Sequence, residues 1–110
     1  ATDLPLTSRQ LKRILKRTGV GIARTGGYTG HGSGEVMIGF TTANRIPSGC
    51  EEELLQLSAI PEHVINRAFL AAAEAEQEAI LNSMTAAKQT RGRKGELYYS
   101  LADYLNDREA

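Results

Sequence analysis

The feature that most constrains this chain is a long run of helix-compatible sequence over residues 61–88. Proline stands at its start, where a helix tolerates it, and apolar side chains then recur near helical spacing. These are Ile65, Phe69, Ala72, Ile80, Met84 and Ala87. A helix of ~28 residues would be about 40 Å long. Its alanine stripe (Ala68, Ala72, Ala75 and Ala79) predicts a smooth face that packs closely against a sheet or another helix.

A second helix is predicted near the N-terminus. Thr7 and Gln10 have the spacing of a capping box, and Leu11, Ile14 and Leu15 follow on one face. Gly19 is expected to end this helix as a C-cap. The opposite face carries Lys12, Arg13, Lys16 and Arg17. Because no aromatic residue interleaves these cations, we interpret them as a solvated face rather than a nucleic-acid patch.

Between these helices lies a glycine-dense stretch, residues 19–44. Val20 and Ile22 before its loop, and Val36, Ile38 and Phe40 after it, alternate with small or polar residues, which predicts two half-buried strands. Six glycines fall between Gly26 and Gly39, a density that a simple connector rarely needs.

The loop suggests two kinds of chemistry. Its glycines could cradle a phosphate, but such motifs lead into a helix, whereas a strand is expected here. Alternatively, Ser33 and Glu35 are two residues apart in an extended segment, so their side chains share one face within hydrogen-bonding reach. Such a pair can orient or relay a proton for a nucleophile held elsewhere. From spacing alone, an ordinary turn serine beside an exposed glutamate remains the commoner explanation.

Towards the C-terminus, residues 90–95 are expected to form an exposed turn, residues 96–100 an edge strand and residues 101–107 a short helix. Residues 51–58 are compatible with a short helix or with irregular structure.

Composition excludes several classes of protein. Thirteen basic residues balance thirteen acidic ones, which argues against nucleic acid or an anionic membrane as a partner. A lone cysteine, Cys50, cannot form an internal disulfide, and no apolar run could span a bilayer, so a cytoplasmic protein is expected. Neither His63 nor Glu74, Glu76 and Glu78 show metal-ligand spacing, so neither a metal nor a cofactor is expected.

Several blocks of sequence together resemble one known family. They are residues 1–3, 5–6 and 10–13, the ARTG block at 23–26, the GSGE block at 32–35, the FTTANR block at 40–45 and the alanine- and glutamate-rich run at 69–83. In this order they are similar to the C-terminal polypeptide of the DmpA and β-peptidyl aminopeptidase family. The resemblance covers nearly the whole chain.

That resemblance implies a function. Family members are self-processing hydrolases in which one precursor cleaves itself into a larger α chain and a smaller β chain, and several αβ units assemble into an oligomer. The serine exposed at the new N-terminus attacks peptides, amides or esters and releases N-terminal residues. Ser33 and Glu35 match the two β-chain positions beside that nucleophile: Ser33 would contact the nucleophile and its amine, and Glu35 would orient Ser33.

The same resemblance implies an α/β fold, a four-layer α/β/β/α sandwich in which residues 1–110 form the β-chain portion of one domain completed by a separate α chain. This chain would supply two or three strands and two main helices. The sequence opens on Ala1-Thr2-Asp3, so the nucleophilic serine is expected just upstream.

Two other functions stay open at this point. One is an acyl transferase subunit related to ornithine acetyltransferase, which has a comparable architecture but an N-terminal threonine; the GSGE block favours the aminopeptidase. The other is a non-catalytic interaction domain built on the long helix.

Overall fold

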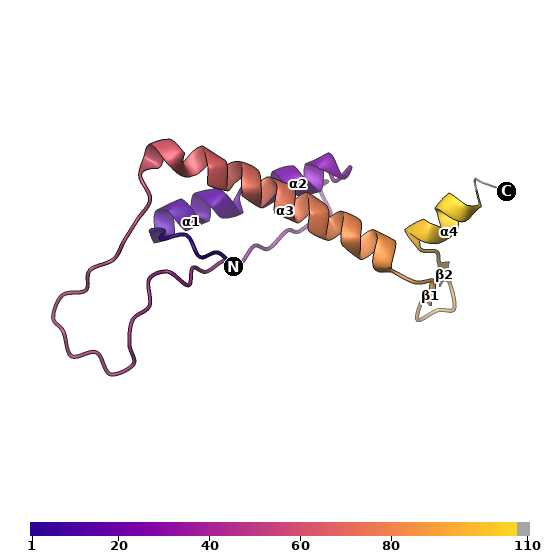
Figure 1. Cartoon of the computed structure of the whole chain (residues 1–110). Coiled ribbons are helices and arrows are strands. Elements are labelled where there is room, and N and C mark those ends of the chain that lie inside the picture. The colour runs from indigo at the N-terminus through magenta and orange to yellow at the C-terminus, as the bar shows by residue number, and fades with distance from the viewer. Residues whose placement is uncertain (108–110) are drawn as a thin grey trace.

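The computed structural model describes residues 1–107 (Figure 1). Its elements follow in the order α1 (Ser8–Leu15), α2 (Thr18–Arg24), a 3₁₀ turn η1 (Glu62–Val64), α3 (Ile65–Ala86), β1 (Thr90–Arg91), β2 (Leu97–Tyr98) and α4 (Leu101–Asn106). The chain measures 65 × 33 × 28 Å, with a radius of gyration of 19.5 Å. A compact domain of this length would have a radius near 13 Å, so the chain is markedly extended.

Helix α3 is the centre of the fold, and both α1 and α2 pack along it (Figure 1). Ile65, Ala68 and Ala73 of α3 are buried, together with Leu6 before α1. The predicted long helix is confirmed, with narrower bounds: residues 62–64 form a 3₁₀ turn, and Pro61 caps that turn in extended conformation.

Helix α1 begins at the predicted capping box. The Thr7 side chain accepts a hydrogen bond from the Gln10 amide, and the Gln10 side chain accepts one from the Thr7 amide. Its basic face is only partly solvated. Lys12 and Lys16 are exposed, but the guanidinium groups of Arg13 and Arg17 lie over the ring of Phe69, 5.2 and 4.0 Å from its centroid.

The strand predicted at Val20 and Ile22 is wrong, because these residues belong to helix α2. Nor does Gly19 end α1: the helix ends at Leu15, and Lys16 and Arg17 keep helical backbone angles that carry the chain into α2. Alternation over four residues fits a strand and one turn of helix about equally well. Packing against α3 decides for the helix, since Gly21 lies directly on the α3 backbone, with no room for a side chain.

The strand predicted over residues 36–40 is also absent from the part of the chain that the structure describes. Its end makes one isolated parallel bridge, in which the Thr2 amide donates to the Phe40 carbonyl (3.1 Å) and the Thr42 amide donates to the Thr2 carbonyl (2.9 Å). Val36 and Ile38 are 88% and 87% exposed. An extended segment becomes a strand only where a neighbour supplies a ladder of hydrogen bonds, and this segment has such a neighbour at one end only.

The C-terminal part forms a small unit beyond α3. Strands β1 and β2 pair antiparallel, with Thr90 opposite Tyr98 and Arg91 opposite Leu97. The predicted strand at 96–100 and helix at 101–107 are thus confirmed within one or two residues. The expected turn at 90–95 is shorter than predicted, because its first two residues form β1. The described residues therefore contain two short strands, in keeping with the two or three expected, but both lie in this hairpin and neither flanks the glycine-rich loop.

Candidate functional site

The glycine-rich loop leaves the C-terminal end of α2. Gly26 has a φ of 97°, which glycine adopts without strain, and this turn lets the amides of Gly26 and Gly27 donate to the Ala23 and Ile22 carbonyls, each at 3.1 Å. The last carbonyl groups of α2 therefore accept hydrogen bonds from the loop itself, and the loop starts from a fixed position beside α3.

Ser33 and Glu35 are brought together in this loop. The Ser33 hydroxyl donates a hydrogen bond to Oε1 of Glu35, the contact that their spacing predicted. The Ser33 amide donates to the Gly30 carbonyl at 2.9 Å, which closes a tight turn beneath the serine. Both side chains are exposed. The pair is therefore oriented by local contacts but open to an approaching group.

The pair borders an open hollow of ≈ 570 Å³. Ile22 of α2 forms one wall, and the loop from Gly26 to Ser33, with Tyr28 and His31, forms much of the rest. The chemistry available is that of an oriented hydroxyl backed by a carboxylate, which can hold a proton or a cationic amine at the Ser33 oxygen. A phosphate cradle of the helix-leading type is not formed, because residues 35–40 contain no helix.

Other candidate residues do not join this site. Cys50 and His63 are exposed elsewhere, in the loop after Asn44 and in η1. Over residues 1–107 no three His, Cys, Asp or Glu side chains cluster in a way that could hold a metal ion. Within the same residues no helix combines the length and the apolar character needed to cross a membrane.

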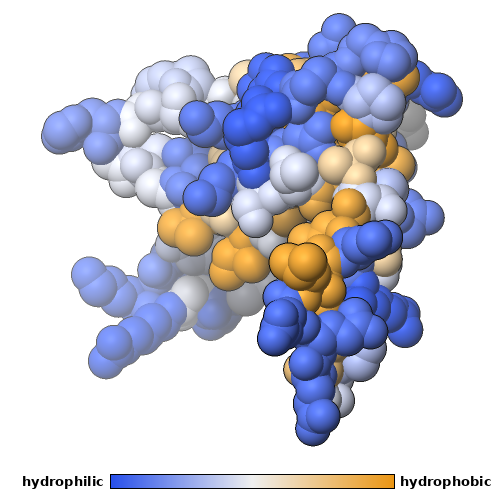
Figure 2. Space-filling model, turned by 90° about the vertical axis from the view of Figure 1, so that its left-hand side faces the viewer, coloured by the Kyte–Doolittle hydropathy of each residue, from blue (hydrophilic) through white to orange (hydrophobic). Residues whose placement is uncertain are grey.

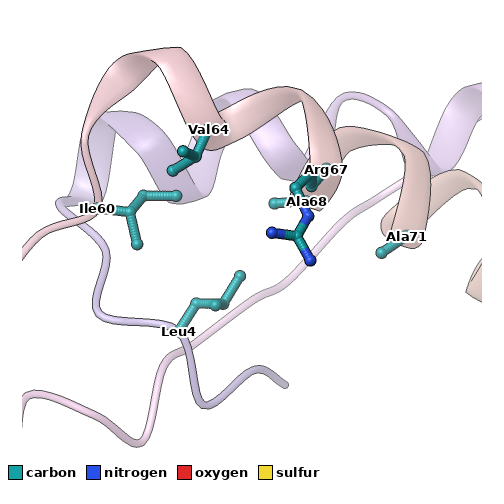
Figure 3. Close-up of a pocket in the computed structure, with 6 residues that line it drawn as sticks. All are labelled: Leu4, Ile60, Val64, Arg67, Ala68 and Ala71. Atoms are coloured by element: carbon teal, nitrogen blue, oxygen red, sulfur yellow. The ribbon is translucent and has the colours of Figure 1, made fainter.

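A second hollow, of ≈ 370 Å³, lies at the N-terminal end of α3 (Figure 3). It is lined by Leu4, Ile60, Val64, Arg67, Ala68 and Ala71. The Arg67 side chain reaches over otherwise apolar surface there. Sequence reasoning missed this hollow, although an arginine between apolar positions on the inner face of α3 is the signal that could have indicated it.

An ion-pair cluster links α1 to the start of α3, and it too was not predicted. Glu62 pairs with Arg9 and Arg13, and the Gln10 amide group donates to Glu62 at 3.1 Å and to the Ile60 carbonyl at 2.8 Å. Desolvation raises the pKa of the Glu62 carboxyl, but the hydrogen bonds from Gln10 and Arg13 and the charges of both arginines outweigh it, so the pKa lies below its ordinary value. The cluster fixes the entry into α3 rather than the glycine-rich loop.

The sequence model of peptidase family S58 matches residues 1–98, which include α1, α2, α3 and the whole glycine-rich loop. This chain belongs to peptidase family S58. The family resemblance drawn from the ARTG, GSGE and FTTANR blocks is confirmed.

Two curated relatives agree with this assignment. The chain is 35% identical over 95 residues to the β-peptidyl aminopeptidase BapA of Sphingosinicella microcystinivorans, and 30% identical over 102 residues to that of Sphingosinicella xenopeptidilytica. These matches cover 86% and 92% of this chain but only 24% and 25% of the relatives. The S58 chain therefore spans about a quarter of the length of the curated relatives it matches.

Solved structures show the same arrangement. The PH0078 protein of Pyrococcus horikoshii OT3 superposes with a TM-score of 0.86 at 46% identity, over 96% of this chain and 30% of that one. The L-aminopeptidase D-Ala-esterase/amidase of Ochrobactrum anthropi is described as a variant of the Ntn-hydrolase fold. It superposes with a TM-score of 0.81 at 31% identity, over 97% of this chain and 32% of that one. A β-aminopeptidase of a Burkholderia species superposes with a TM-score of 0.81 at 32% identity, over 96% of this chain and 33% of that one. The S58 chain thus has the α/β fold of the matching part of these three structures.

Proposed function

We propose that the S58 chain is the β chain of a self-processing aminopeptidase. In this proposal one precursor cleaves itself into an α chain and this β chain, and a serine just upstream of Ala1 becomes the nucleophile. The enzyme would release N-terminal residues from peptides, amides or esters. The observation that carries the proposal is the Ser33–Glu35 hydrogen bond, found on the glycine-rich loop of a chain from a peptidase family.

The direction of that hydrogen bond supports the roles of the two residues. Because the Ser33 hydroxyl donates its proton to Glu35, the lone pairs of its oxygen are left to accept a hydrogen bond from an incoming ammonium or hydroxyl group. The Glu35 carboxylate then compensates the positive charge of that ammonium group. Both residues act as positioning residues for a nucleophile held by another segment, and the oxyanion would be stabilised by groups of the α chain.

The large exposed surface of this chain supports the proposal that an α chain covers part of it. The accessible area is 9066 Å², whereas a compact protein of 11.9 kDa would expose about 6,000 Å². The excess, about 3,000 Å² on this chain alone, is more than three times the ~800 Å² that each partner buries in an interface of standard size. Val36 and Ile38 lie on the segment that lacks a strand partner, so an α chain that completes a sheet there would bury them. We further propose that several αβ units assemble into an oligomer and that the enzyme is cytoplasmic.

The test uses the full-length protein with Ser33→Ala and Glu35→Gln, and His63→Ala as a control at an exposed residue outside this site. We expect either variant to lower kcat/KM for an amino-acid p-nitroanilide by about 10²–10⁴-fold, the scale of lost acid–base assistance, while His63→Ala retains activity. Urea unfolding checks that stability is unchanged.

Intact mass spectrometry of each protein reports whether two chains are formed, so that a loss of processing is separated from a loss of turnover. Full activity in both variants would refute the roles given to Ser33 and Glu35. An active wild-type protein that remains a single chain would refute self-processing.

A further inference from the structure

The segment that leads into α1 is held on both sides, although it lies outside every helix and strand. On one side, the Pro5 carbonyl accepts a hydrogen bond from the Ile60 amide at 2.9 Å. On the other side, Thr2 forms its parallel bridge with Thr41, and the Thr41 hydroxyl donates to the Leu4 carbonyl. The N-terminal segment is therefore fixed against the residues that follow the glycine-rich loop.

The hydroxyl of Thr41 is used twice. Besides donating to the Leu4 carbonyl, it accepts a hydrogen bond from the Ala43 amide at 3.2 Å, and the residue is half-buried. The contact with Ala43 holds the hydroxyl in place, so the contact with Leu4 determines which residue of the N-terminal segment lies beside Thr41. A slip of one residue would turn every side chain of an extended segment to its opposite face. Thr41 therefore sets the register of the N-terminal segment.

This register can be followed upstream of Ala1. In a parallel pair both segments run the same way and advance equally along their length. Glu35 lies six positions before Thr41, and the position six before Thr2 is the fifth residue upstream of Ala1. Because the hydrogen bonds of a parallel pair are slanted, a chain in this register would bring its fifth or sixth upstream residue beside Glu35.

A groove follows the same path over the helices. It consists of two hollows: one of ≈ 280 Å³ has Ala1 and Thr2 in its lining, and one of ≈ 290 Å³ has Glu35 in its lining. The two hollows adjoin, because four residues line both: Leu15, Thr18, Ile38 and Glu76. The groove therefore starts at Ala1 and ends at Glu35.

Exposed apolar side chains alone do not identify what fills this groove, since hydrophobic side chains emerge among hydrophilic ones at several places on the face of the molecule shown in Figure 2. The groove is distinguished by its two ends: an upstream chain would enter at Ala1, and the far end is part of the Ser33–Glu35 site. The segment directly upstream of Ala1 is thus the occupant that fits. A strand has two edges, so the other edge of residues 36–40 is left for a strand of the α chain.

We propose that Thr41 is a positioning residue for the nucleophile. By fixing the register of the N-terminal segment, Thr41 directs the chain upstream of Ala1 along the groove and places its fifth or sixth residue at Ser33 and Glu35. This inference rests on the proposed function, because it takes the nucleophilic serine from that upstream chain. Without the Thr41 hydroxyl the segment can shift, and a misplacement of about 1 Å at a reacting group can lower turnover by about 10²-fold.

The first test is the N-terminus of the smaller chain formed by the full-length wild-type protein. Intact mass and N-terminal sequencing should show a chain that begins with serine, five or six residues before Ala1. A smaller chain that begins elsewhere would overturn the register while leaving self-processing intact. An active protein that remains a single chain would instead refute the proposed function, and this inference with it.

The second test compares three variants of the full-length protein. Thr41→Val keeps the shape of the side chain without its hydroxyl, and Thr41→Ser keeps the hydroxyl. The matched control, Thr90→Val, also removes a hydroxyl-to-carbonyl hydrogen bond (to Lys88, 3.0 Å), but in the hairpin beyond α3. We expect Thr41→Val to lower kcat by about 10–100-fold with little change in KM, because the nucleophile moves and the substrate pocket does not. Thr41→Ser should recover most of this loss, and Thr90→Val should match wild type.

Each kcat is expressed per folded, processed enzyme, measured by circular dichroism and intact mass. Failure of Thr41→Val to form two chains, with normal processing of Thr41→Ser, would also support the proposal, since the same serine attacks the precursor. A wild-type kcat in Thr41→Val would overturn it. So would equal losses in Thr41→Val and Thr41→Ser, or a loss confined to the amount of folded enzyme, either of which would show that the hydroxyl does not position the nucleophile.

Discussion

Alanine substitutions at two glycines of α2 should have opposite effects on stability. A Cβ atom built on Gly21 would lie 2.6 Å from the Ala73 carbonyl oxygen, 2.7 Å from Cβ of Glu76 and 2.9 Å from the Gln77 amide nitrogen. Two of these three atoms belong to the α3 backbone and cannot rotate away, so α2 must move outward until the contacts approach 3.4 Å. Overpacking of this kind costs about 1–3 kcal/mol.

The control is Gly19, two residues earlier in the same helix. Its nearest neighbour would be the terminal methyl group of Met37, at 3.8 Å, which is ordinary contact. Gly19→Ala should therefore stabilise the protein by about 0.5–1 kcal/mol through helix propensity alone. Gly21→Ala has the same gain, so its net loss should be about 0–2.5 kcal/mol, which makes it about 1–3 kcal/mol less stable than Gly19→Ala.

Urea unfolding of the full-length protein, followed by circular dichroism, measures both free energies. A Gly21→Ala protein as stable as the Gly19→Ala protein would refute the close approach of α2 to α3. Destabilisation by Gly19→Ala would instead refute the assignment of this segment as a helix.

Three further predictions concern α1 and its contacts. Glu62→Gln should flatten the pH dependence of stability. Because the pKa of Glu62 is lowered, its carboxylate stabilises the fold above pH 4.5, the ordinary pKa of a glutamate, and this contribution is lost as the pH falls through the folded-state pKa. Free energies of unfolding measured between about pH 6 and pH 3 will show the difference. A double-mutant cycle with Arg17→Met and Phe69→Leu should give a coupling of about 0.5–2 kcal/mol at a half-buried cation–π contact, and additive effects would contradict that contact. Thr7→Ala should cost about 1 kcal/mol of unfolding free energy by removing the N-cap, whereas Ser8→Ala, just inside the helix, should change stability little; equal effects would argue against the capping box.

Much of the local structure could be predicted because it depends on neighbours in the sequence. The capping box at Thr7, the long helix α3 and the C-terminal helix all follow from hydrogen bonds and apolar spacing within a few residues. The Ser33–Glu35 contact belongs to the same class, since it joins residues two positions apart. The family was recognisable for a related reason: several short blocks occur in a fixed order along the whole chain.

The errors fall where distant segments decide the conformation. Val20 and Ile22 alternate as in a strand, yet the fit of Gly21 against the α3 backbone holds the segment in a helix. The segment from Val36 to Phe40 has strand-like sequence, but among residues 1–107 it has a pairing neighbour only at its end, where Thr2 bridges Thr41.

By itself, then, the sequence determined through local periodicity and capping that α1, α3 and α4 are helical, and which polar pair the glycine-rich loop presents. Only the tertiary structure decided how α2 lies on α3 and that Arg9 and Arg13 converge on Glu62. The reason is physical: a hydrogen bond between near neighbours needs only local backbone angles, whereas a contact across some fifty residues depends on the path of all the chain between.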